Sequence, residues 1–130
     1  KERRLKYEFE LDGLRIVFPA TAGAIRREGK VLAHCVGGYA SRHMSGVCTI
    51  LFLRRADDPH TPYVTIEMDG NKIRQIHGYH NDTLAGSPKP REVHKDFLAA
   101  WLRWLRAGSQ RNEDGTPKLP KRTKKQKEVA

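Results

Sequence analysis

Two stretches of the chain alternate between apolar and polar residues, each around a short turn signal. The first covers residues 7–18 around Asp12-Gly13, and the second joins residues 63–68 to residues 72–78 around Asp69-Gly70-Asn71. A period of two is typical of strands with one buried face, and Asp-Gly accepts the positive φ angles of a two-residue hairpin turn. Both stretches are therefore predicted to be β-hairpins.

The register of the second hairpin decides which of its side chains share a face. A two-residue loop, at either of its two possible positions, places Glu67 on the face of Lys72 and Arg74. The same register places Gln75 and His77 on the opposite, apolar face, and a three-residue loop would reverse this parity. A buried Gln75 would need a hydrogen-bond partner, such as a loop backbone.

Between the hairpins, residues 47–53 form an unbroken apolar run that predicts a central strand buried on both faces. Before it, Thr21 can cap a helix over residues 22–27, which Gly29 would end. The glycines Gly37 and Gly38 predict a break, followed by a second short helix from Tyr39 that stops at Gly46.

After the second hairpin, a helix is predicted that begins near Pro88 and Pro90 and ends before Gly108. One stripe of this helix is apolar and is predicted to pack on the sheet: Val93, Phe97, Trp101, Trp104 and Leu105. The pattern as a whole predicts one α+β domain over residues 1–108, with a mixed or antiparallel sheet of about five strands. Residues 109–130 are expected to form a flexible basic tail.

The chain has 130 residues and a formal net charge of +10, from 25 Lys and Arg against 15 Asp and Glu. This length fits one domain, and the charge favours a polyanionic partner such as nucleic acid or a nucleic-acid-bound protein. No run of about 18 apolar residues predicts a membrane span, and the basic N-terminus does not resemble a signal peptide. A cytoplasmic location is therefore expected, with Cys35 and Cys48 as free thiols. Oligomeric state stays open.

The basic residues are spread over the domain and the tail. Residues 110–130 carry seven cations and three carboxylates, so the rest of the chain is basic as well. Binding through these charges would be largely independent of nucleic-acid sequence and would weaken with salt. The candidate contacts are Arg26, Arg27, Lys30, Arg54, Arg55, Lys72, Arg74, Lys121, Arg122, Lys124 and Lys125. A solubilising surface is the alternative.

The densest group of reactive side chains is His34-Cys35-Val36-Gly37-Gly38-Tyr39. Together with Thr65-Ile66-Glu67 and the block from Gln75 to Asn81, it resembles the PcfJ-like family over residues 32–104. That family takes its name from a protein of conjugative plasmids and also occurs in phages and other mobile elements. The resemblance implies a genomic context rather than a reaction.

The order Cys35, His77, Asn81 is similar to that of cysteine hydrolases, in which a histidine deprotonates the thiol and an amide orients the ring. Packing of Cys35 as a small apolar residue is the alternative. Histidine and cysteine donors are numerous, but none has the spacing of a zinc site, and no metal or cofactor is predicted.

A further hypothesis places a polar pocket for a nucleotide, a phosphate or a protein tail around the glycine break. Its residues would be His34, Gly37, Gly38, Tyr39, Arg42, Glu67, Gln75 and Gly78. Three functions follow from these patterns: a nucleic-acid-binding or ribonucleoprotein-associated accessory protein of a mobile element, a cysteine-dependent hydrolase or transferase, and a protein-interaction regulator of host defence or plasmid transfer. The first, which is not an enzyme, is preferred.

Overall fold

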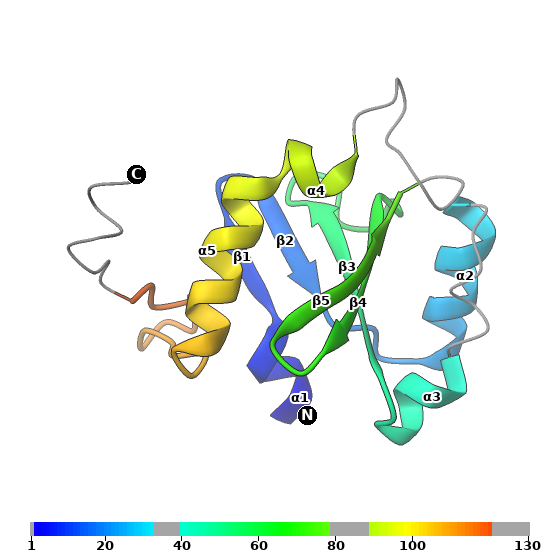
Figure 1. Cartoon of the computed structure of the whole chain (residues 1–130), viewed down its shortest axis with the longest axis horizontal. Helices are drawn as coiled ribbons and strands as arrows, with labels where there is room; N and C mark the ends of the chain where they lie inside the picture. Colours follow the sequence, from blue (N-terminus) through cyan, green and yellow to red (C-terminus); the bar gives the residue numbers. More distant parts are fainter. Residues whose placement is uncertain (1, 33–39, 79–88, 121–130) are drawn as a thin grey trace.

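A computed structural model of the chain describes residues 2–32, 40–78 and 89–120. In these residues one sheet separates helix α5 (Lys95–Arg106) from helices α2 (Ala22–Leu32) and α3 (Ala40–Ser45), as Figure 1 shows. Every strand is antiparallel to the next, in the order β1 (Phe9–Leu11), β2 (Leu14–Val17), β3 (Thr49–Arg55), β4 (Val64–Asp69) and β5 (Lys72–His77). The predicted single α+β domain with an antiparallel sheet is confirmed.

Both predicted hairpins are present. Asp12 and Gly13 have φ values of 52° and 83° and connect the paired residues Leu11 and Leu14. Two positive φ angles match the right-handed twist of the flanking strands. In the second hairpin Asp69 pairs with Lys72, so the loop is Gly70-Asn71.

The prediction of which side chains share a face in the second hairpin is wrong beyond the first residues of β5. A β-bulge between Glu67 and Met68 shifts the register, so that Glu67 opposes Gln75 and Thr65 opposes His77. A bulge adds one residue to one strand and reverses the alternation that follows it. Gln75 and His77 therefore share the face of Glu67, and Gln75 is exposed there rather than buried on the apolar face.

The sheet face toward α5, called the α5 face here, carries the larger core. Trp101 and Trp104 are both 0% exposed, as predicted for packing residues. Their indole N–H groups donate to the carbonyls of Tyr7, at 3.0 Å, and Gln110, at 2.6 Å. Burial of an indole in this way combines a large apolar area with a satisfied hydrogen-bond donor. Because one acceptor is the last residue of the N-terminal helix and the other follows α5, the two tryptophans attach both ends of the described chain to the core.

The opposite face, called the α2 face, has a smaller apolar cluster in which Ile25 packs with Ile50 and Phe52. Beside it lies a buried ion pair: the Arg54 guanidinium donates to the two carboxylate oxygens of Glu28 at 2.7 and 2.5 Å. Burial raises the pKa of Glu28, although the hydrogen bonds and charge of Arg54 oppose that shift. This pair attaches α2 to the middle strand of the sheet.

The N-terminal half of the chain differs from the predictions in two places and agrees with them in a third. Gly29 does not end α2, which continues to Leu32, because tertiary contacts of a buried helix face outweigh the roughly 1 kcal/mol cost of an internal glycine. The capping by Thr21 is confirmed, since its Oγ1 accepts from Ala24 N at 3.1 Å. The N-terminal helix α1 (Glu2–Tyr7) was not predicted.

The predicted C-terminal helix is divided into α4 (Pro90–Val93) and α5, with His94 between them at φ −109°. Val93 does not join the apolar stripe and is 47% exposed. After α5, Gly108 has a φ of 104°, which suits a glycine at a helix end.

Residues 109–120 lie against the N-terminal elements. Arg111 donates to the carbonyls of Leu5 and Glu8 at 2.8 and 2.6 Å, and Ser109 Oγ donates to the Lys6 carbonyl at 2.6 Å. Residues 121–130 lie outside the described residues, so the predicted tail and its boundary at residue 108 stay a prediction. No helix in the described part of the chain is long and apolar enough to cross a membrane.

Replacing only one member of the Glu28 and Arg54 pair should strongly destabilise the domain. Glu28→Leu leaves a buried guanidinium unpaired, and we expect the free energy of unfolding to fall by about 3–5 kcal/mol. The double variant Glu28→Leu, Arg54→Met removes both charges and should recover most of this loss. Urea unfolding of the three proteins measures the effect, and equal losses in the single and double variants would contradict it.

The domain should also lose stability as the pH falls below about 6.5. His43 is buried in α3 and its Nδ1 accepts from Ile50 N at 3.0 Å, while burial, and then Arg3, lower its pKa. Because the pKa of His43 is lower in the folded state, the unfolded state binds more protons as the pH falls. The contribution of His43 to stability is therefore fully present above its unfolded pKa and declines below that pKa.

Urea unfolding at pH 7.5 and 5.5 tests this prediction, with His43→Asn as the comparison. The asparagine Oδ1 can accept the same N–H but does not titrate. The variant should therefore be less stable at both values but show a smaller change between them. The same slope in both proteins would exclude His43 as the group responsible.

Candidate functional site

Polar side chains gather on the α2 face of the last two strands. We call Thr65, Glu67, Arg74, Gln75 and His77 the β4–β5 polar face. They are neighbours because Thr65 opposes His77 and Glu67 opposes Gln75 across the ladder. The neighbouring strand contributes the apolar Ile50 to the same face, so the polarity changes abruptly from β3 to β4.

Glu67 is the most buried carboxylate of this group, with 8% exposure. Its Oε2 lies 4.0 Å from Arg74 Nε, but Arg74 is largely exposed. An exposed ion pair of this length contributes well under about 1 kcal/mol, so it does not lock Glu67 in place. Glu67 is a nearly fully buried carboxylate at the border between the sheet and solvent.

Gln75 and His77 form a pair of their own. His77 Nε2 and Gln75 Oε1 are 3.1 Å apart, so the ring nitrogen donates when it carries the proton. Both side chains reach solvent, Gln75 more than His77. Together they present an amide and an imidazole, which can donate or accept hydrogen bonds from a bound molecule.

Cys48 lies beside this polar face, at the start of β3. Burial raises the pKa of its thiol, the Glu67 charge raises it further, and Arg42 is the first of the cations that oppose the shift. A raised pKa keeps the group as a thiol at neutral pH, and a thiol is a poor nucleophile. This cysteine is therefore a packing residue of the site.

Buried polar groups support the site from beneath. Thr65 Oγ1 donates to Glu28 Oε2 at 3.3 Å and so joins the polar face to the buried ion pair. Glu28 was not among the predicted site residues. The signal for it is its position three residues after Ile25, where a carboxylate shares the buried face of an amphipathic helix and so requires a buried partner.

Among the described residues, the proposed contacts of the basic surface divide into two groups. Most are exposed: Arg26, Arg27 and Lys30 on α2, Arg55 at the end of β3, and Lys72 and Arg74 on β5. Arg54 does not belong with them, because it is 4% exposed and its charge is used by Glu28. The alternation of β3 turns it toward α2, so it cannot meet a phosphate.

Of the predicted pocket residues, the structure brings together Glu67 and Gln75, and His77 of the predicted catalytic group lies beside them. Arg42 lies on α3, near enough for its charge to act on Cys48, and Gly78 is buried directly after β5. The remaining predicted residues of the pocket, the catalytic group and the basic tail lie outside the described residues: His34, Cys35, Gly37, Gly38, Tyr39, Asn81, Lys121, Arg122, Lys124 and Lys125. The order Cys35, His77, Asn81 therefore stays a prediction.

The described site presents a carboxylate, a guanidinium, an amide and an imidazole on neighbouring strands. Its side chains offer hydrogen bonds and mixed charge, and the described residues contain no group of three or more His, Cys, Asp and Glu side chains that could hold a metal ion. Fold and site thus define an α+β domain with a polar, cation-bordered sheet face.

Comparison with known proteins identifies the family. Residues 1–90 match the sequence model of the PcfJ-like protein family, so the chain belongs to this family. The match includes the N-terminal hairpin and ends at residue 90, whereas the resemblance noted from the motifs covers residues 32–104. An uncharacterized protein of Listeria innocua serovar 6a is 33% identical in an alignment of 91 residues that covers 62% of this chain and 20% of that protein. The chain therefore spans about a fifth of that relative's length, and no solved structure matches.

Labelling of the cysteines with iodoacetamide tests the geometry around Cys48. At pH 7 we expect Cys48 to react more slowly than a free thiol, because its pKa is raised. Glu67→Gln removes one negative charge beside it and should accelerate the reaction by about two- to threefold. Peptide mass spectrometry separates Cys48 from Cys35. An unchanged rate in the variant would show that Glu67 does not act on the thiol.

Proposed function

We propose that this domain is a nucleic-acid-binding accessory module of a mobile genetic element. The observation that carries the proposal is the position of two cationic groups on one side of the sheet. Arg26, Arg27 and Lys30 extend from the exposed side of α2, while Lys72 and Arg74 lie on β5. Helix α2 packs on the sheet face that carries Glu67, and Lys72 and Gln75 pair with Asp69 and Glu67 of that same face, so both groups lie on one side of the sheet.

The charges on α2 are available for an external anion. The helix uses Ile25 and Glu28 to contact the sheet, and this leaves Arg26, Arg27 and Lys30 exposed. Arg27 makes one hydrogen bond, 3.4 Å to the carbonyl of His60, and keeps its charge. Such cations attract phosphates without reading sequence.

The polar sheet face supplies the second kind of contact. Gln75 and His77 are oriented by their mutual hydrogen bond and can reach sugar or phosphate oxygens as well as base edges. The buried Glu67 beside them disfavours a phosphate directly over β4. We therefore infer that the nucleic-acid backbone runs between α2 and the cationic end of β5.

The genomic setting in the proposal rests on family membership, because the PcfJ-like family occurs in conjugative plasmids, phages and other mobile elements. Neither the family name nor the Listeria relative describes a reaction. A binding module agrees with a site that has hydrogen-bonding groups and cations. The activity of a longer protein that contains such a domain is likewise part of the proposal.

A salt series of binding to single- and double-stranded DNA and RNA tests the proposal. The triple variant Arg26→Gln, Arg27→Gln, Lys30→Gln should lower the magnitude of the slope of log K against log salt by about two to three, because each lost phosphate contact removes about 0.7–0.9. Affinity should fall for all sequences alike.

A matched variant with Lys89→Gln, Arg91→Gln and Lys95→Gln serves as the control. It removes the same charge from exposed positions: Lys89 directly precedes α4, Arg91 lies in α4, and Lys95 begins α5, the helix on the other side of the sheet. It should change the slope by less than one. Equal slopes in the two triple variants, or no binding at low salt, would overturn the proposed interface.

A further inference from the structure

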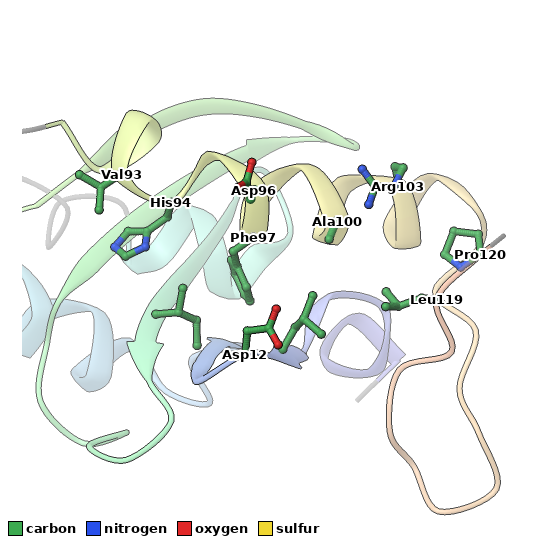
Figure 2. Close-up of a pocket in the computed structure, with 11 residues that line it drawn as sticks. Asp12, Val93, His94, Asp96, Phe97, Ala100, Arg103, Leu119 and Pro120 are labelled. Atoms are coloured by element: carbon green, nitrogen blue, oxygen red, sulfur yellow. The ribbon is translucent and has the colours of Figure 1, made fainter. Parts of the chain in front are cut away.

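A groove runs along the α5 side of the molecule, between α5 and the tip of the first hairpin (Figure 2). One part has a volume of about 470 Å³ and the adjoining part about 450 Å³. The two parts share Asp12, Leu14 and His94, so they form one continuous groove. It lies on the side of the sheet opposite to the β4–β5 polar face.

The floor of the groove is apolar. Leu11, Leu14, Phe97 and Ala100 line it, and Phe97 extends from α5 toward the hairpin in Figure 2. Two of the exposed large apolar side chains lie along its border, Val93 with 47% and Leu119 with 45% exposure. Exposed apolar residues beside an apolar groove are typical of a docking surface.

The charge of the groove is opposite in sign to that of the chain. Its charged residues are Asp12, Asp57 and Asp96 against Arg55 and Arg103, whereas the whole chain carries +10. Within the described part of the chain none of these three carboxylates forms an ion pair. The Arg55 guanidinium lies over the ring of Tyr63 at 5.0 Å and keeps its charge, so the five residues sum to a net charge of −1.

His94 does not add a positive charge. Its Nε2 is 2.7 Å from the Tyr63 hydroxyl, and burial, followed by the charge of Arg55, lowers its pKa. The imidazole is therefore neutral at neutral pH and holds Tyr63 at the end of the groove. The groove thus combines an apolar floor with a net negative border.

We propose that this groove docks an extended segment of a partner protein in which an aliphatic side chain is flanked by lysine or arginine. The aliphatic side chain would contact Leu14 and Phe97, and the cation would lie near Asp12. The chain itself provides an example of this chemistry at one end of the groove: Leu119 lines it and follows Lys118 in the sequence.

Fluorescence anisotropy with the full chain tests the proposal. The probe is a fluorescein-labelled peptide that copies residues 116–123, which contain one leucine between lysines. Saturable binding is expected even though peptide and protein are both basic, because the groove combines an apolar floor with a net negative border. Replacing the leucine of the peptide by serine should weaken binding about tenfold, the loss expected for one aliphatic contact.

Two substitutions in the protein locate the site without disturbing the fold. Val93→Lys changes an exposed residue and should weaken binding about tenfold, whereas Asp12→Asn should weaken it about threefold. Asparagine tolerates the positive φ of position 12, so the turn should remain. Asp69→Asn removes the same charge at the second hairpin and should leave affinity unchanged, and thermal unfolding verifies that all variants fold.

Absence of binding, or equal affinity in the wild type, Val93→Lys and Asp12→Asn, would overturn the proposal. Sedimentation velocity tests whether a second copy of this chain occupies the groove instead. A dimer of the wild type that Val93→Lys abolishes would assign the groove to self-association and would also overturn docking of a partner segment. A wild type that sediments as a monomer while it binds the peptide supports the proposal.

Discussion

The buried pair between Glu28 and Arg54 is the interaction on which the arrangement of this domain depends. Removing two charges from water costs several kcal/mol for each ion, and the cost is offset only when their hydrogen bonds are satisfied. Here the guanidinium donates twice to the carboxylate and once to the Pro59 carbonyl, and Thr65 donates to the same carboxylate. A helix held in this way has one position on the sheet, so the pair also decides which side of α2 presents its cations to solvent.

The two faces of the sheet have different roles. The α5 face buries the tryptophans and most of the core, and it leaves a groove where the first hairpin and α5 separate. The α2 face has the smaller core and becomes polar toward β4 and β5. Stability is therefore concentrated on one side of the sheet, while the groups able to form hydrogen bonds with a polyanion lie on the other. Neither the PcfJ-like family nor the Listeria relative, of which this chain covers about a fifth, is described with an activity for either face.

A single irregularity decides which residues form the polar face. Without the bulge at Glu67, strict alternation would send Gln75 and His77 into the apolar face. With the bulge they join Glu67 and Thr65, while Ile73 and Ile76 turn toward the α5 side. The bulge adds its extra residue at Arg74, which is exposed and can be accommodated there. The alternation of polar and apolar residues in the sequence cannot locate such an insertion, because the polar residues of β5 fit either register.

The sequence by itself determined the elements whose signals are local. Asp12-Gly13 specified a turn, the apolar run before Arg54 specified the central strand, and the spacing of Phe97, Trp101 and Trp104 specified the helix that covers the sheet. Only the tertiary structure decided that α2 continues through Gly29, that Arg54 is buried rather than available to a phosphate, and that Asp12 borders a groove with His94. The physical reason is that turn geometry and side-chain periodicity depend on neighbours in the sequence, whereas the burial of a charge depends on what another element brings to it.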